Sequence, residues 1–128
     1  FQAIGEGQRS LLDKLTRLDP ARDAAFIGFE PVGRTPLGVV RLHGDADGRE
    51  AEFAILVRSD AHNHGIGHAL MSLIIETARE RGLAAIHGQI LPENGRMLAF
   101  VRDLGFRLSS TPEAVVVARL ALDPAQSE

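Results

Sequence analysis

In the stretch RSDAHNHGIGHALMSLI, residues 58–74, the spacing of apolar residues changes from that of a strand to that of a helix. Before it, residues 49–57 read REAEFAILV, in which apolar side chains alternate as they do in a half-buried strand. From Ile66 to Ala78 the apolar residues instead recur at helical spacing. The stretch therefore predicts a strand, a glycine-containing turn and a helix, and it raises the question of what the turn binds.

The rest of the chain predicts further helices and strands on either side of this stretch. A capped amphipathic pattern predicts a helix over Ser10–Leu18, and a second apolar stripe predicts one over Met97–Leu104. The predicted strands are Ala24–Glu30, Pro36–Gly44, Arg49–Val57, Leu83–Leu91, Phe106–Ser110 and Ala114–Leu122. We expect the first three strands to form an antiparallel meander. This order of elements predicts an α/β (α+β) domain with a mixed sheet and helices on its faces.

Composition limits the classes of function. The 128 residues fit a single domain, 1–128, with 123–128 as a tail. A net charge of −3 without blocks of like charge argues against nucleic acid or a membrane surface as the partner. The chain has no cysteine, which excludes disulfides, thiolate nucleophiles and Cys-ligated zinc and fits a cytoplasmic protein.

The turn with Gly65 and Gly67 is a candidate phosphate site. A Walker loop is excluded because no Gly-Lys-Ser/Thr follows, and a dinucleotide fingerprint fails because Leu70 occupies the third glycine position. What remains is the general capacity of free backbone N–H groups at a helix N-terminus to bind an anion. A glycine that merely allows the helix to start is an equally good explanation of the pattern.

Metal binding is the competing interpretation, because His62, His64 and His68 lie close together in sequence. His64 and His68 are four residues apart, but His64 precedes the helix and no glutamate lies between them. A zinc site would also need a third protein ligand, such as His43 or His87. We therefore expect no metal, and solvated loop histidines are the simpler explanation.

Residues 52–106 resemble the GNAT acetyltransferase superfamily. That family has a strand, a loop of the form Gln/Arg-x-x-Gly-x-Gly/Ala, a helix, a strand, an Asn and a helix ending in Gly-Phe. Here residues 62–67 fill the loop, Asn94 matches the Asn, and Gly105-Phe106 the ending. The resemblance implies a GNAT-like mixed, mostly antiparallel central sheet flanked by helices and splayed at the strand before the loop. Within the superfamily, the chain is similar to the catalytic domain of bacterial protein lysine acetyltransferases.

The chain departs from the family pattern in three ways. His62 stands where the family has Gln or Arg, and Val101 stands where a Tyr often acts as general acid. The chain contains no Tyr at all, so the proton donor to the thiolate is undetermined. The family's N-terminal strand and helix have no counterpart before Ser10, which is what a fragment of a longer protein would show.

The resemblance implies an acetyl-CoA site. Backbone amides from Asn63 to Ala69 would bind the pyrophosphate, and the backbone of Ile55–Val57 would pair with the pantetheine, with an N–H near Leu56 as an oxyanion donor. Ordinary core packing, a helix N-cap and a solvated helix face are the alternative roles of Ile55, Asn94 and Arg102. The implied cofactor-binding residues are Ile55, Leu56, Val57, His62, Asn63, His64, Gly65, Ile66, Gly67, His68, Ala69, Asn94, Val101 and Arg102.

Glu52 is the candidate general base, because the family's catalytic glutamate falls at this point of the strand. Burial within AEFAILV would suit it to take a proton at neutral pH, and a solvent-facing strand glutamate is the alternative. We expect an acetyl-CoA-dependent N-acetyltransferase that works by direct attack on a protein lysine. A small amine or amino acid as acceptor, or a catalytically silent acyl-CoA sensor, remains an alternative. The expected partners are acetyl-CoA and the amine acceptor, and a homodimer is left open.

Overall fold

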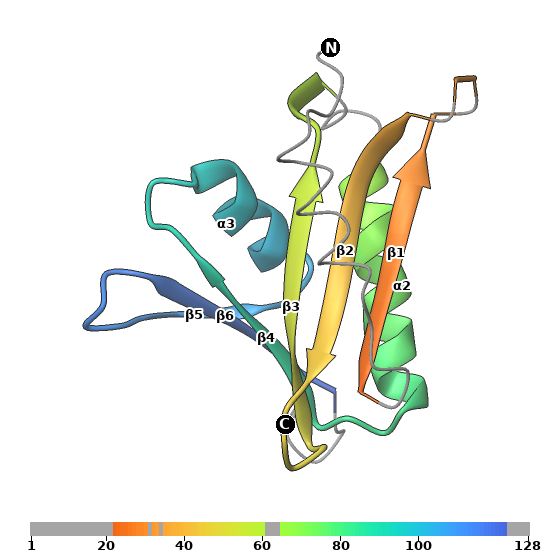
Figure 1. The fold of residues 1–128 in the computed structure, drawn as a ribbon. Helices are drawn as coiled ribbons and strands as arrows, with labels where there is room; N and C mark the ends of the chain where they lie inside the picture. Colours follow the sequence, from red (N-terminus) through yellow and green to blue (C-terminus); the bar gives the residue numbers. More distant parts are fainter. Residues whose placement is uncertain (1–21, 31, 34, 61–64, 123–128) are drawn as a thin grey trace. The chain divides into compact units, whose positions relative to one another are not determined.

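The structure is a computed structural model that describes residues 22–30, 32–33, 35–60 and 65–122. The predicted helix Ser10–Leu18, the loop residues 61–64 and the tail 123–128 lie outside the described residues. The elements are β1 (Asp23–Phe29), β2 (Pro36–Gly44), β3 (Glu50–Val57), α2 (Ile66–Glu80), β4 (Ala85–Ile90), α3 (Gly95–Asp103), β5 (Arg107–Ser110) and β6 (Val116–Ala121) (Figure 1).

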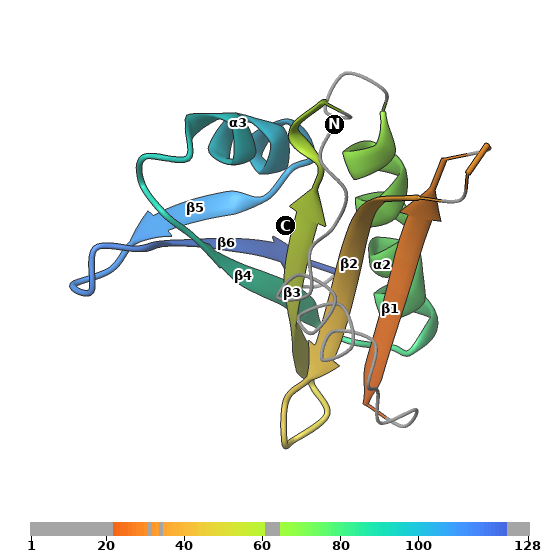
Figure 2. The ribbon, with the colours of Figure 1, turned by 45° about the horizontal axis from the view of Figure 1, so that its top comes forward.

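The strands are hydrogen-bonded in the order β1-β2-β3-β4-β6-β5, and Figure 2 shows β6 running between β4 and β5. The pairs β1–β2, β4–β6 and β5–β6 are antiparallel, whereas β3–β4 is parallel. A short turn joins β2 to β3, and the N–H of Asp45 donates to the carbonyl of Glu50 at 2.9 Å. The predicted α/β fold, with a mixed and mostly antiparallel sheet flanked by helices, is confirmed.

The chain divides into two compact units. Unit 1 comprises Phe1–His43 and Ala54–Thr77, and unit 2 comprises Gly44–Phe53 and Ala78–Glu128. Strand β3 and helix α2 each begin in one unit and end in the other.

In unit 1, helix α2 packs on β1 and β2 because two strand glycines leave room for it. A side chain at Gly28 would overlap Ile66, and a Cβ at Gly38 would lie 3.2 Å from Leu70 Cδ1 and 3.0 Å from the carbonyl oxygen of Leu56. These glycines allow the first two turns of α2 to approach the strands closely. The fully buried apolar residues of unit 1 include Val40, Leu42, Met71 and Ile74.

The core of unit 2 contains an aromatic pair. The rings of Phe53 and Phe106 have centroids 5.3 Å apart at an interplanar angle of 59°, a favourable tilted arrangement. Phe53 lies on Gly88, where a Cβ would come within 2.5 Å of the ring. Phe106 reaches this core because α3 ends in a left-handed Gly105 (φ +99°), and the N–H of Phe106 donates back to the carbonyl of Val101 at 3.0 Å. The Gly-Phe ending thus has a packing role.

Candidate functional site

Strand β3 carries the candidate base on its open face. Ala51 and Phe53 are buried, while Glu52, Ala54 and Leu56 are exposed, as the twofold alternation of a strand requires. Glu52 is therefore the solvent-facing strand glutamate that was weighed as the alternative, and not a buried carboxyl group. Since Phe53 takes the core position, its neighbour Glu52 must point to the other face, where a ligand or an acceptor can reach it.

The residues expected to pair with the pantetheine lie beyond the part of this strand that pairs with β4. The parallel register of β3 with β4 runs from Glu50 opposite Ala85 to Glu52 opposite His87. Strand β3 continues to Val57, so Ile55–Val57 follow the last residue of that register. Backbone groups on the β4 side of the strand beyond that register are available to pair with an extended ligand. The splay of the sheet itself stays a prediction.

The turn before α2 has the backbone geometry of an anion site. Gly65 is in the left-handed conformation (φ +73°), and its carbonyl accepts the N–H of Ala69 at 3.0 Å. The amides of Ile66, Gly67 and His68 precede this first helical bond and have no carbonyl four residues earlier within the helix. The amide of Ala69 is used by the helix, which corrects the expectation that it too would bind phosphate.

The side chains at the start of α2 are also compatible with a bound anion. The first turn of α2 has no acidic residue, and His68 in it is exposed. An anion there would meet no repulsion from that turn and would gain from the helix dipole. The expected contributions of His62, Asn63 and His64 fall outside the described residues.

Arg58 anchors the end of β3, just before this turn, although no pattern in the sequence predicted a role for it. Its Nη1 lies 2.8 Å from Oε1 of Glu30, and its Nε donates to Asp60. Desolvation acts to lower the pKa of Arg58, but the hydrogen bonds and charges of Asp60 and Glu30 outweigh it, so its pKa lies above the ordinary value. The hydrogen bond from Arg58 lowers the pKa of Asp60.

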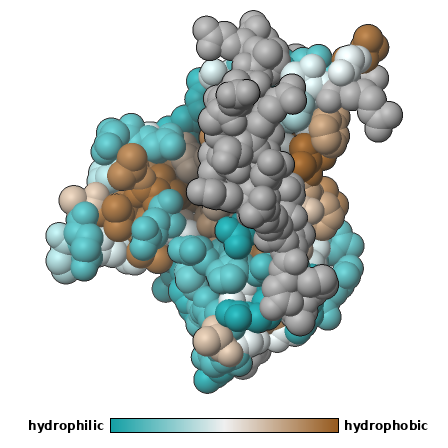
Figure 3. Space-filling model, viewed as in Figure 1, coloured by the Kyte–Doolittle hydropathy of each residue, from teal (hydrophilic) through white to brown (hydrophobic). Residues whose placement is uncertain are grey.

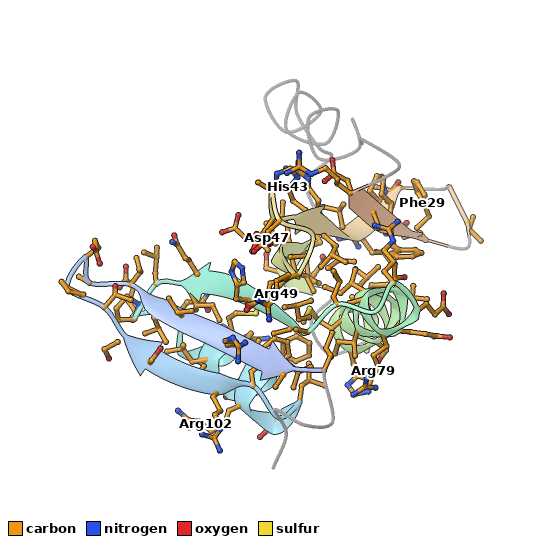
Figure 4. The ribbon with its side chains drawn as sticks, turned by 90° about the horizontal axis from the view of Figure 1, so that it is seen from below. Phe29, His43, Asp47, Arg49, Arg79 and Arg102 are labelled. Atoms are coloured by element: carbon orange, nitrogen blue, oxygen red, sulfur yellow. The ribbon has the colours of Figure 1, made fainter. Side chains whose placement is uncertain are left out.

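Three expected cofactor residues lie in and beside α3, in unit 2. Asn94 is the N-cap, and its side-chain oxygen accepts the N–H of Met97 at 3.2 Å, which is the structural role weighed as its alternative. Val101 is completely buried, and its expected place in the cofactor site stays a prediction. Arg102 is exposed in the last turn of α3 and points away from the strands (Figure 4).

Two histidine–aspartate pairs were not predicted. In unit 1, Nδ1 of His43 lies 2.5 Å from Oδ1 of Asp23, whose side chain is buried. In unit 2, Nε2 of His87 lies 3.5 Å from Oδ2 of Asp45. The partners are 20 and 42 residues apart in the chain, so the packing of separate segments brings them together.

Neither metal ligands nor membrane spans are found in the described part of the chain. Among the residues that the structure describes, no three His, Cys, Asp or Glu side chains gather as a metal site would require. The described helices include none with the length and apolar character needed to cross a membrane.

Comparison with known proteins assigns the family. The family model "Acetyltransferase (GNAT) family" matches residues 5–106. The GNAT domain of S. lividans PAT is 27% identical, with a TM-score of 0.75 over 88% of this chain and 68% of that one. Nourseothricin acetyltransferase is 22% identical (TM-score 0.71; 81% and 68% covered). The PaiA N-acetyltransferase of Thermoplasma acidophilum, solved with coenzyme A, is 16% identical (TM-score 0.75; 89% and 70%). The chain belongs to the GNAT family and is an acetyl-CoA-dependent N-acetyltransferase.

Proposed function

We propose that the acceptor is a lysine side chain of a protein and that Glu52 is the general base. The observation that carries the proposal is the exposed face of β3, where Glu52, Ala54 and Leu56 follow one another. An open strand face suits a side chain presented by a large acceptor better than an enclosed small molecule. The similarity to bacterial protein lysine acetyltransferases, and the 27% identity with the GNAT domain of S. lividans PAT, support the same class of acceptor.

Within this proposal, acetyl-CoA is held by backbone groups of unit 1. The free amides at the start of α2, from Ile66 to His68, bind the pyrophosphate. The backbone of Ile55–Val57 pairs with the pantetheine as an added strand would. An N–H near Leu56 then donates to the thioester oxygen, which becomes negative when the amine attacks.

Glu52 addresses the main energetic obstacle, which is the charge of the acceptor. A lysine amine with a pKa of about 10.4 is neutral in only about one molecule in 2,500 at pH 7, a penalty of roughly 4.6 kcal/mol. A carboxylate on the exposed face of β3 can take the proton directly or through one water.

In the reaction the acceptor nitrogen loses two protons and the leaving thiolate gains one. The acceptor ammonium gives one proton to Glu52, and the neutral nitrogen forms the C–N bond while the C–S bond breaks. The nitrogen then loses a second proton, and the leaving thiolate gains one. Because the chain contains no tyrosine, no phenol of this chain can supply the thiolate proton, and we propose that water or the departing ammonium proton does so.

The test is thiol release from acetyl-CoA with lysine-bearing proteins and, in parallel, small amines and amino acids. We expect acetylated lysine in proteins by intact-mass and peptide analysis. Glu52→Gln should lower kcat about 100-fold or more while leaving coenzyme A affinity unchanged. Unchanged turnover of Glu52→Gln would remove Glu52 as the base, and turnover with small amines alone would select the small-molecule alternative. Cytoplasmic location and a homodimer stay predictions.

A further inference from the structure

One face of unit 2 carries a row of ionisable side chains across three neighbouring strands. Glu52 on β3 is the register partner of His87 on β4, and His87 is in turn the register partner of Arg119 on β6. Register partners project from the same face of a sheet, and neighbouring strands are about 4.8 Å apart. His87 therefore stands between the candidate base and a guanidinium.

Further charged groups surround the row. Asp45, in the turn before β3, lies 3.5 Å from Nε2 of His87. Glu50 accepts from Arg119, with its Oε2 3.2 Å from Nη2. In Figure 3 the surface over the hairpin end of β3 is hydrophilic. The side chain of His87 is 29% exposed, so it lies among these groups and still contacts solvent.

We propose that His87, held by Asp45, is the positioning residue that carries the proton from Glu52 to solvent. The inference rests on the proposed role of Glu52. After Glu52 has taken the ammonium proton, its O–H bond breaks and an N–H bond forms at Nδ1 of His87. The imidazolium is stabilised by the carboxylate of Asp45, which faces Nε2, and it releases one proton to water. Glu52 is then a carboxylate again, and no other bond changes.

This assignment explains why an ionisable ring occupies this position of β4. An imidazole ring has two nitrogens that can each hold and release a proton, which a relay to solvent requires. Asp45 comes before β3 in the chain and faces the ring nitrogen from outside β4, so it can fix the ring orientation without competing with Glu52. Arg119 is engaged by Glu50, which offsets the repulsion that a guanidinium would impose on an imidazolium.

The experiment compares His87→Gln, His87→Ala and Glu52→Gln with the parent chain, using acetyl-CoA and the acceptor that thiol-release screening selects. His87→Gln should lower kcat about 10- to 100-fold with little change in the KM for acetyl-CoA. Added imidazole should restore much of the rate of His87→Ala, which a purely structural defect would not permit. In the double variant, His87→Gln should cost nothing further once Glu52 is Gln, because His87 acts through Glu52.

The matched control is Gln89→Ala, two residues further on the same face of β4, which should leave kcat within about twofold of the parent. The relay is overturned if His87→Gln has the kcat of the parent, or if added imidazole does not raise the kcat of His87→Ala. In either case the role of Glu52 stays intact if Glu52→Gln is inactive. An active Glu52→Gln overturns the proposed base and the relay together.

Discussion

At the level of single residues, Gly65 and Gly82 can be compared directly because they have the same backbone conformation. Both have φ +73°, and at both a Cβ would meet no atom within 4 Å. An alanine at either position therefore encounters the same backbone penalty, about 1–2 kcal/mol for a left-handed residue, with no clash added. They differ in location, because Gly65 precedes the first turn of α2 and Gly82 follows its last.

We predict that Gly65→Ala and Gly82→Ala lose similar stability but differ in ligand binding. Relief of the strain in Gly65→Ala would shift the turn and misdirect the amides of Ile66–His68, weakening coenzyme A binding about tenfold or more. Gly82→Ala should bind as the parent does. Urea unfolding measures the first quantity and calorimetric titration with coenzyme A the second. Equal affinities in the two variants would contradict a role of this turn in phosphate binding.

Residue identities alone left the exposure of Glu52 and the role of Val101 undecided. The alternation of β3 was visible in the sequence, but a carboxylate within AEFAILV could be read as buried or exposed. The structure settles the matter through Phe53, which fits onto Gly88 and against Phe106, neither of them a sequence neighbour. Val101 is buried likewise.

At the level of elements, the Arg58 contacts join the ends of two strands. Arg58 follows β3, Glu30 follows β1, and Asp60 leads into the loop before α2. The interaction depends on the carboxylate form of Asp60, whose pKa is lowered by the hydrogen bond from Arg58. A carboxyl group with a lowered pKa in the folded state stabilises the fold above its ordinary pKa, here 3.8, and loses that contribution as the pH falls through the folded value.

We predict that Asp60→Asn lowers the melting temperature at pH 7 and pH 5 by the same small amount, and that the difference from the parent shrinks below about pH 4. The control is Glu93→Gln, which removes an exposed carboxylate of the β4–α3 turn that takes no part in the Arg58 contacts. Thermal unfolding followed by circular dichroism from pH 7 to pH 3 gives both curves. A stability difference that persists unchanged at pH 3 would show that Asp60 acts other than through its charge.

The elements themselves were largely predictable, because hydrophobic period and turn chemistry are local signals. The sequence predicted β2 as Pro36–Gly44 and the start of α2 at Ile66, as the structure has them. Contacts between elements were not predictable. The pair Asp23–His43 depends on the register of β1 with β2, and the pair Asp45–His87 depends on where the turn after β2 lies. No local sequence pattern specifies either.

At the level of the whole molecule, ligand binding and folding stability are linked. A ligand that binds only the folded chain stabilises it by about 2.7 kcal/mol at a free concentration 100 times its Kd. For a chain of 128 residues this corresponds to a rise in melting temperature of roughly 10 °C. The measurement needs no knowledge of the acceptor, so it tests the cofactor site apart from the chemistry.

We predict that coenzyme A raises the melting temperature by this amount and that ADP, which retains the pyrophosphate, gives part of the rise. Adenosine should give none, because the amides of Ile66–His68 would have no phosphate to bind. Gly65→Ala should reduce the rise in melting temperature with ADP and with coenzyme A alike. Glu52→Gln should leave both rises intact, since the side chain of Glu52 contacts neither the pyrophosphate nor the adenine. If adenosine raised the melting temperature as much as ADP did, the binding energy would come from contacts to the adenine and the ribose, and the turn before α2 would not be the anchor of the cofactor.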